Sequence, residues 1–158
     1  MNTLYLLYDA TCPASQRHIE WLMRRRAIVP LRCVPHQDAG LLARNPGLAA
    51  HLAPRELTAV SDDGHVWTGP AASVVSLFML ENYRELAERL AQPTLVPMAR
   101  LALELLTREV FELTCLLRRS SAAELENLLR LNAEPLRRHF NLPPPIPPPA
   151  IATAIGQV

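Results

Sequence analysis

The chain has 158 residues, is 49% hydrophobic and carries a formal net charge of +1. This length suits one domain with an appended segment, and the hydrophobic content is enough for a packed core. The nearly neutral charge argues against nucleic acid or an anionic membrane surface as a general partner. Three scattered cysteines are too few for a disulfide framework, which predicts a protein of the reducing cytoplasm.

The sequence predicts neither a secretion signal nor a membrane span. No basic segment followed by an apolar segment stands at the N-terminus. No uncharged apolar run approaches the ~20 residues that a membrane-spanning helix needs. All 16 basic residues are arginine, which we interpret as the mark of a GC-rich bacterial genome rather than of function.

The first third of the chain predicts a strand-helix-strand unit. Residues 4–8 form an apolar run that ends at Asp9, as in a buried central strand. Residues 13–27 read as a helix, with an apolar stripe and three arginines in its last turn. Residues 29–35 read as a second strand, parallel to the first, whose two prolines favour an edge position.

The middle of the chain predicts short helical pieces and then a hairpin. Residues 39–44 and 47–52 are the helical pieces, split by an Asn-Pro-Gly sequence. Two β-rich runs, 56–61 and 65–68, flank an Asp-Asp-Gly turn. A helix follows over about 70–91. This element order predicts an α/β fold with a thioredoxin-like core, in which helices flank a four-stranded mixed sheet.

Everything after the core is predicted to be helical, followed by a proline-rich tail. Pro93 and Pro97 break the chain, a helix runs to about residue 119, and a capping box at Ser121 opens a last helix to about residue 139. The predicted division is a thioredoxin-like domain over 1–92, a helical extension packed on it over 93–141, and a tail over 142–158, which should be polyproline II.

The candidate site is the corner where the first strand meets the first helix. Cys12 falls at the N-cap and Pro13 at the first helical position, where its missing N–H costs nothing. Free N–H groups and the helix dipole favour a thiolate there, and a thiolate is the nucleophile of disulfide exchange. The carboxylate of Asp9 raises the thiol pKa unless it turns into the loop as a hydrogen-bond acceptor. Ser15 stands where a second cysteine would attack a mixed disulfide, and its hydroxyl can only stabilise the thiolate.

These residues resemble the DCC family of thiol-disulfide oxidoreductase-like proteins, also described as a domain of unknown function. The resemblance covers roughly residues 3 to 115, and its segments read LLYDATCPAS, LRCVPHQD and ELTAVSDDGHVWTGPAA. It implies a thioredoxin-like fold and redox chemistry at Cys12, with Asp9 as the other matching motif residue. Ala10 replaces the family glycine and Ser15 replaces the second cysteine, so the resemblance does not imply dithiol redox cycling within the motif. The Cys-Pro-x-Ser corner is also similar to that of monothiol glutaredoxins, which use external glutathione.

Other candidate residues have competing structural interpretations. Cys33 lies inside the second predicted strand and reads as a core residue rather than the resolving thiol. His36 is expected at the same sheet edge as Cys12, where it is either a thiolate partner or a surface residue. Pro54 is either the proline packed on the nucleophile or an ordinary loop residue. A metal site of Cys12, Cys33 and His36 would lack a second ligand pair, so no metal is predicted.

Two functions follow from the sequence. The first is an enzyme, a thiol-disulfide oxidoreductase that attacks a protein or small-molecule disulfide through Cys12. It has no tightly bound cofactor and uses glutathione or a partner thiol to resolve the intermediate. The alternative is a redox-inactive thioredoxin-like scaffold module. Its helical extension and proline-rich tail would bind a protein partner or a second copy of the chain. The first requires an exposed, acidic thiol.

Overall fold

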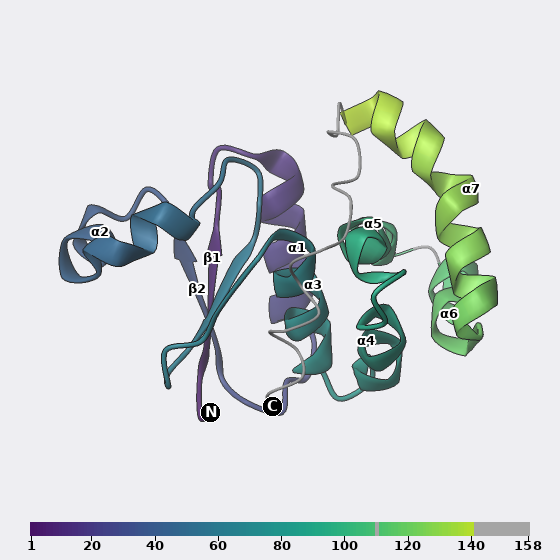
Figure 1. The fold of residues 1–158 in the computed structure, drawn as a ribbon, viewed down its shortest axis with the longest axis horizontal. Coiled ribbons are helices and arrows are strands. Elements are labelled where there is room, and N and C mark those ends of the chain that lie inside the picture. Colours follow the sequence, from purple (N-terminus) through teal and green to yellow (C-terminus); the bar gives the residue numbers. More distant parts are fainter. Residues whose placement is uncertain (110, 141–158) are drawn as a thin grey trace.

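The computed structural model describes residues 1–109 and 111–140 (Figure 1). Its centre is a four-stranded mixed sheet in the order β2-β1-β3-β4. The strands are β1 (Leu4–Tyr8), β2 (Leu31–Pro35), β3 (Thr58–Ser61) and β4 (Val66–Thr68). β1 runs parallel to β2 and antiparallel to β3, and β3 pairs antiparallel with β4. The predicted parallel unit, edge position of β2 and hairpin are confirmed.

The two faces of the sheet differ in what covers them. Figure 1 shows α1 (Pro13–Met23) and α3 (Gly69–Phe78) on one side, and α2 (Ala39–Arg44) on the other. On the α1 side, Leu4 and Leu6 are fully buried. On the other side Tyr5 stays 39% exposed, and neither α2 nor the following 3-10 helix (Pro46–His51) contains a buried residue. The core therefore lies between the sheet and α1 with α3. This arrangement is the predicted α/β, thioredoxin-like layout.

The C-terminal helices share that core. They comprise α4 (Arg84–Leu90), a 3-10 turn (Val96–Met98), α5 (Ala99–Thr107), α6 (Phe111–Arg119) and α7 (Ala122–Phe140). Leu90, Leu106 and Leu117 are fully buried and belong to one apolar cluster with the strand residues. The capping box is confirmed, because the Ser121 N–H donates to Oε2 of Glu124 at 2.8 Å. The predicted tail, 142–158, lies outside the described residues, and the domain boundary at residue 93 stays a prediction.

Two predicted helices end early because their ends pair with each other. The helix expected over 13–27 stops at Met23, so its three arginines follow the helix instead of forming its last turn. The helix expected over 70–91 is split between α3 and α4. The Ile28 N–H donates to the Met79 carbonyl at 2.8 Å, and the Glu81 N–H donates to the Arg26 carbonyl at 3.0 Å. These bonds draw both segments into extended pairing, which a helix at either position would exclude.

A third predicted helix is also split. The helix expected to run to about residue 119 divides into α5 and α6. Glu109 adopts a left-handed backbone conformation, with φ of 54°, between them. A residue in this conformation ends an α-helix, so the chain turns before α6 begins.

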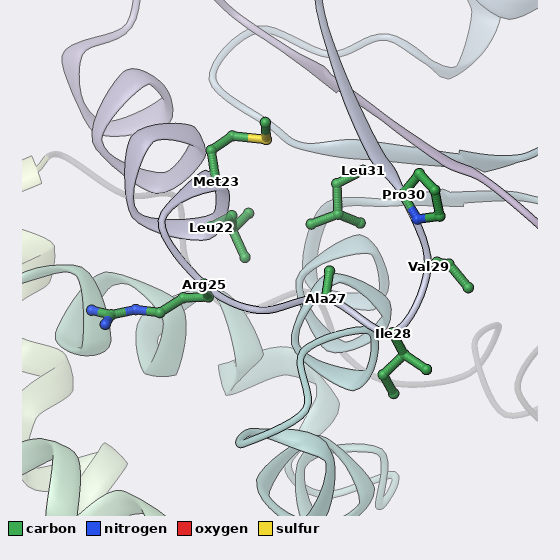
Figure 2. A pocket seen from close by; sticks show the side chains of 8 residues that line it. All are labelled: Leu22, Met23, Arg25, Ala27, Ile28, Val29, Pro30 and Leu31. Atoms are coloured by element: carbon green, nitrogen blue, oxygen red, sulfur yellow. The ribbon is translucent and has the colours of Figure 1, made fainter.

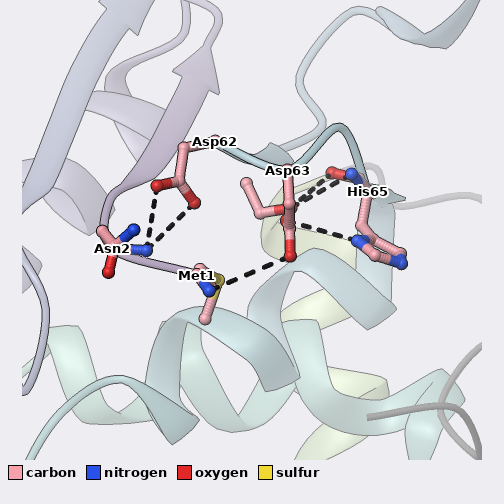
Figure 3. A network of polar contacts seen from close by, with 6 residues as sticks. Met1, Asn2, Asp62, Asp63 and His65 are labelled. Carbon is pink, nitrogen blue, oxygen red and sulfur yellow. Dashed lines mark hydrogen bonds and ion pairs between the residues drawn. The ribbon is translucent and has the colours of Figure 1, made fainter.

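The hairpin turn is tied to the start of the chain. Gly64 has a φ of 90°, which an L side chain would find strained, so the Asp-Gly turn signal has a structural cause. Both oxygens of Asp62 accept from the Asn2 N–H, and Asp63 contacts the Met1 amino group and His65 (Figure 3). These contacts anchor the start of β1 against the hairpin. No helix in the described part of the chain is long and apolar enough to cross a membrane.

Candidate active site around Cys12

Cys12 occupies the N-cap of α1, as its position in the sequence predicts. Its backbone is extended, with φ of −96° and ψ of 113°, and Pro13 is the first helical residue. The Cys12 N–H donates to the Asp9 carbonyl at 3.2 Å, and its own carbonyl accepts from the Gln16 N–H at 3.1 Å. The side chain is half-buried. The thiol therefore stands at the free N–H end of α1 and remains reachable from solvent.

The groups around the sulfur favour its charged form. Burial raises the pKa of the Cys12 thiol, but the N–H and hydroxyl of Ser15 and the N–H of Ala14 lower it further than burial raises it. The charge of Asp9 also raises it, and the outcome is a thiol pKa below its ordinary value. Cys12 makes no side-chain capping hydrogen bond, so this stabilisation comes from several weak donors rather than one bond. Ser15 itself is 7% exposed.

Asp9 is turned into the loop and acts as an acceptor. Its Oδ1 accepts from the Thr11 N–H at 2.9 Å, from the Thr11 hydroxyl at 2.6 Å and from the Gln37 amide at 3.0 Å. Its Oδ2 accepts from the Arg55 N–H at 3.1 Å. The Thr11 hydroxyl and the other donors hold the pKa of Asp9 at about 2, although the carboxylate is buried. A carboxylate this acidic cannot serve as a general base near pH 7, so its contribution is to fix the corner.

Gln37 and Arg55 are site residues that sequence reasoning missed. Gln37 contacts the corner twice, because its amide also accepts from the Ala10 N–H at 3.3 Å. Arg55 has a φ of 63°, a strained conformation for a residue with a side chain. These contacts connect positions 28 and 46 residues away from Asp9. In the sequence, the one sign of the Gln37 contact is that residue 37 directly follows the end of a predicted strand. The Arg55 contact has no such sign.

Pro54 lies in a turn four residues before β3, next to Arg55. The described part of the chain contains no cis peptide bond, so the peptide bond before Pro54 is trans. The loop reaches the Cys12 corner through the backbone of Arg55, which is the link to Asp9 described above.

His36 and Cys33 occupy β2 and its end. The His36 N–H donates to the Tyr8 carbonyl at 2.8 Å, which places it at the Asp9 end of the sheet. Its buried Nε2 has no hydrogen-bond partner. Cys33 lies opposite Leu6 in the sheet and packs against the core. Burial raises the pKa of Cys33 to about 11, so this thiol is neutral at pH 7.

His18 is engaged elsewhere. Its Nε2 lies 2.7 Å from Oε2 of Glu104 on α5, and both side chains are buried. Burial favours the neutral carboxyl, but the hydrogen bond and charge of His18, with Arg17, lower the pKa of Glu104. This pair connects α1 to the C-terminal helices one turn beyond Ser15.

In the described residues, neither a metal-binding cluster nor the hollow at the far end of α1 forms a second candidate active site. No group of three or more His, Cys, Asp or Glu residues able to hold a metal ion occurs in the described ranges. A hollow of about 280 Å³ lies at the opposite end of α1 (Figure 2). Its lining is largely apolar and includes Leu22, Ile28 and Leu31. It contains neither a nucleophile nor a carboxylate.

No protein-family model, curated protein or solved structure matches the chain. The resemblance of the Cys12 motif to the DCC family therefore stays a prediction.

Proposed function

We propose that the protein is a thiol-disulfide oxidoreductase that works through Cys12 alone. The observation that carries this proposal is a half-buried thiol at the N-cap of α1 whose pKa is lowered by Ser15 and Ala14. Thiolate character and access decide whether a cysteine is reactive. Cys12 combines both.

The reaction begins when the Cys12 thiolate attacks one sulfur of a disulfide. A bond forms between Sγ and that sulfur, the original S–S bond breaks, and the other sulfur leaves as a thiolate with the bonding electron pair. The product is a mixed disulfide on Cys12. An incoming thiolate then attacks this bond and releases Cys12 as a thiolate again.

The second thiol must come from outside the motif. Ser15 stands where a second motif cysteine would be, and a hydroxyl does not attack a disulfide. Cys33 is unsuitable because burial raises its pKa to about 11. Glutathione or a thiol of the partner protein is the proposed resolving group, with a reducing cytoplasm as the proposed setting.

The family assignment belongs to the same proposal. Asp9 and Cys12 are the residues that match the DCC motif, and the hydrogen bonds of Asp9 give the first of them a structural role at this corner. Ala10 also departs from the motif, but it is the departure at Ser15 that agrees with a monothiol mechanism.

A second candidate, a redox-inactive interaction module, rests on the C-terminal helices. Leu116 on α6 is 54% exposed and Leu131 on α7 is 79% exposed. Large apolar side chains exposed in this way favour contact with a protein partner or a second copy of the chain.

The test is the pH dependence of Cys12 alkylation in a Cys33→Ser, Cys115→Ser background. We expect a midpoint below the free-cysteine value of ~8.5. Cys12→Ser in the same background is the control and should show no labelling. Reduction of a model disulfide coupled to glutathione should then depend on Cys12. A midpoint at or above the free value, or labelling only after unfolding, would reject the redox function in favour of the interaction module.

A further inference from the structure

A small hollow adjoins Ser15, the residue that contributes to the environment of the Cys12 sulfur. Its floor includes Ser15, His18 and Ser73, all of them buried. Its rim carries Arg55, from the loop before β3, and Arg100, from the first turn of α5. Four separate parts of the chain, namely α1, the loop before β3, α3 and α5, therefore bring polar side chains together beside the residue that stabilises the thiolate.

The two rim arginines are available to a ligand. Arg55 is exposed and Arg100 is partly exposed. Within residues 1–109 and 111–140, neither guanidinium makes a hydrogen bond or ion pair. Arg55 is held at the rim by its backbone, since its N–H donates to Asp9. A guanidinium presents paired donors that match the two oxygens of a carboxylate.

Three acidic side chains of the described residues lie near the hollow, and none of them forms an ion pair with Arg55 or Arg100. Glu104 is shared by His18, at 2.7 Å, and Arg17, at 3.3 Å. Glu56 comes near the hollow, because a Cβ built on Gly69 would lie 3.1 Å from Oε2 of Glu56. Asp9 is a third carboxylate, because it accepts from the Arg55 N–H at 3.1 Å. Three carboxylates therefore balance Arg17 and the two rim arginines, and what the rim offers a ligand is two unpaired guanidinium groups rather than an excess of positive charge.

We propose that the two arginines at the edge of this hollow, which itself has room for about one water molecule (about 10 Å³), bind a carboxylate group and thereby select disulfides that carry a carboxylate as substrates of Cys12. The substrate class rests on the proposed function, since it assumes that Cys12 attacks disulfides. Ser15 provides the geometric link, because it lines the hollow and also contributes to the environment of the Cys12 sulfur. A carboxylate held at the rim places the attached disulfide beside the thiolate. The covalent step is the exchange described above, with no further reactant.

The test compares two disulfide probes on the Cys33→Ser, Cys115→Ser protein. Dithiobis(nitrobenzoate) carries carboxylates, whereas dithiodipyridine is uncharged. We expect Arg55→Gln and Arg100→Gln each to slow the reaction with the charged probe by about threefold and the double variant by about tenfold. The ratio of the charged-probe rate to the neutral-probe rate should fall by these factors, so that any general change in the thiolate or the fold is divided out.

A matched control removes the same charge elsewhere. Arg24 is exposed just beyond the C-terminal end of α1, roughly 17 Å from Cys12 by helix rise. This separation exceeds the Debye length of about 8 Å at physiological salt, so Arg24→Gln should change neither rate. Equal loss with both probes, or equal loss in Arg24→Gln and Arg55→Gln, would overturn the carboxylate site.

Binding without chemistry separates this proposal from the redox function. Cys12→Ser protein is titrated with S-methylglutathione, which carries carboxylates but cannot exchange disulfides. Amide resonances of Gly69 and Ser73 are followed by NMR. We expect saturable shifts that disappear in the Arg55→Gln, Arg100→Gln variant. Such shifts together with an unreactive Cys12 would reject the redox function and keep the site. Absent shifts together with a reactive Cys12 would do the reverse.

Discussion

Replacing Asp9 by asparagine should destabilise the fold by about 2 to 4 kcal/mol at pH 7. The lowering of the Asp9 pKa from 3.8 to about 2 corresponds to about 2 kcal/mol of preference for the charged form in the folded protein. Asparagine also offers only one acceptor oxygen. If that oxygen takes the place of Oδ1, the new amide group faces the Arg55 N–H, which loses its acceptor. A partly buried donor left unsatisfied adds up to about 2 kcal/mol.

The same pKa sets the pH dependence of this effect. Because the pKa of Asp9 is lower in the folded than in the unfolded protein, its contribution is complete above the unfolded value of 3.8 and disappears as the pH falls through about 2. Between pH 5 and pH 3, the native protein should lose about 1 kcal/mol of stability that the Asp9→Asn variant does not lose. Urea titrations of both proteins at several pH values measure this difference.

Asp62→Asn provides the matched control. Asp62 also accepts hydrogen bonds, but both come from the exposed Asn2 N–H, so its replacement should change stability little. The thiol adds an independent check. Asp9 raises the pKa of Cys12, so removing its charge should make Cys12 more acidic while the protein becomes less stable. Equal stability of the Asp9→Asn and native proteins at pH 7, or a difference that persists unchanged down to pH 3, would refute this account of the corner.

Three further substitutions address separate interactions. Ser15→Ala should shift the midpoint of Cys12 alkylation to higher pH, because the variant keeps the N–H of residue 15 but loses the hydroxyl that lowers the Cys12 pKa; an unchanged midpoint would exclude the Ser15 hydroxyl from the site. Glu104→Gln should cost about 2 kcal/mol in urea unfolding at pH 7, since a charged partner of His18 becomes neutral. Because the pKa of Glu104 is lowered by folding, this cost should shrink as the pH falls below 4.5, the value of the unfolded carboxyl. Ser121→Ala should remove about 1 kcal/mol through loss of the α7 cap, measured as an earlier urea midpoint.

The features that could be predicted from the sequence are those that depend only on residues adjacent in the chain. β1, the N-cap position of Cys12 and the hairpin at Gly64 follow from short patterns: an apolar run, a proline at the first helical position, and an Asp-Gly turn. The acceptor role of Asp9 could be stated as a condition for an acidic thiol, but its donors could not be named. Two of them belong to Gln37 and Arg55, which reach the corner only after β2 and β3 have joined β1.

The ends of helices were predicted least well, because they depend on tertiary contacts between distant segments. The apolar stripe of the first helix continues to Ala27 in the sequence, and nothing local forbids helix there. Ala27 instead pairs with Leu80, and this one contact ends one helix and splits another. Propensity gives no sign of such competition, because each segment is helical until the other is present.

Asp9 connects the stability of the corner with its proposed chemistry. The left-handed conformation of Arg55 costs roughly 1–3 kcal/mol, and it places the backbone N–H on Oδ2 of Asp9 at 3.1 Å. The same residue carries one of the two guanidinium groups at the rim of the hollow beside Ser15. A neutral residue at position 9 would relieve the thiol of an unfavourable charge, but it would also release the loop that presents Arg55. The Asp9 carboxylate therefore has two opposite effects. It raises the pKa of the Cys12 thiol, but it also fixes Arg55 and the turn before Cys12. In this way it holds the proposed substrate-binding group next to the attacking sulfur.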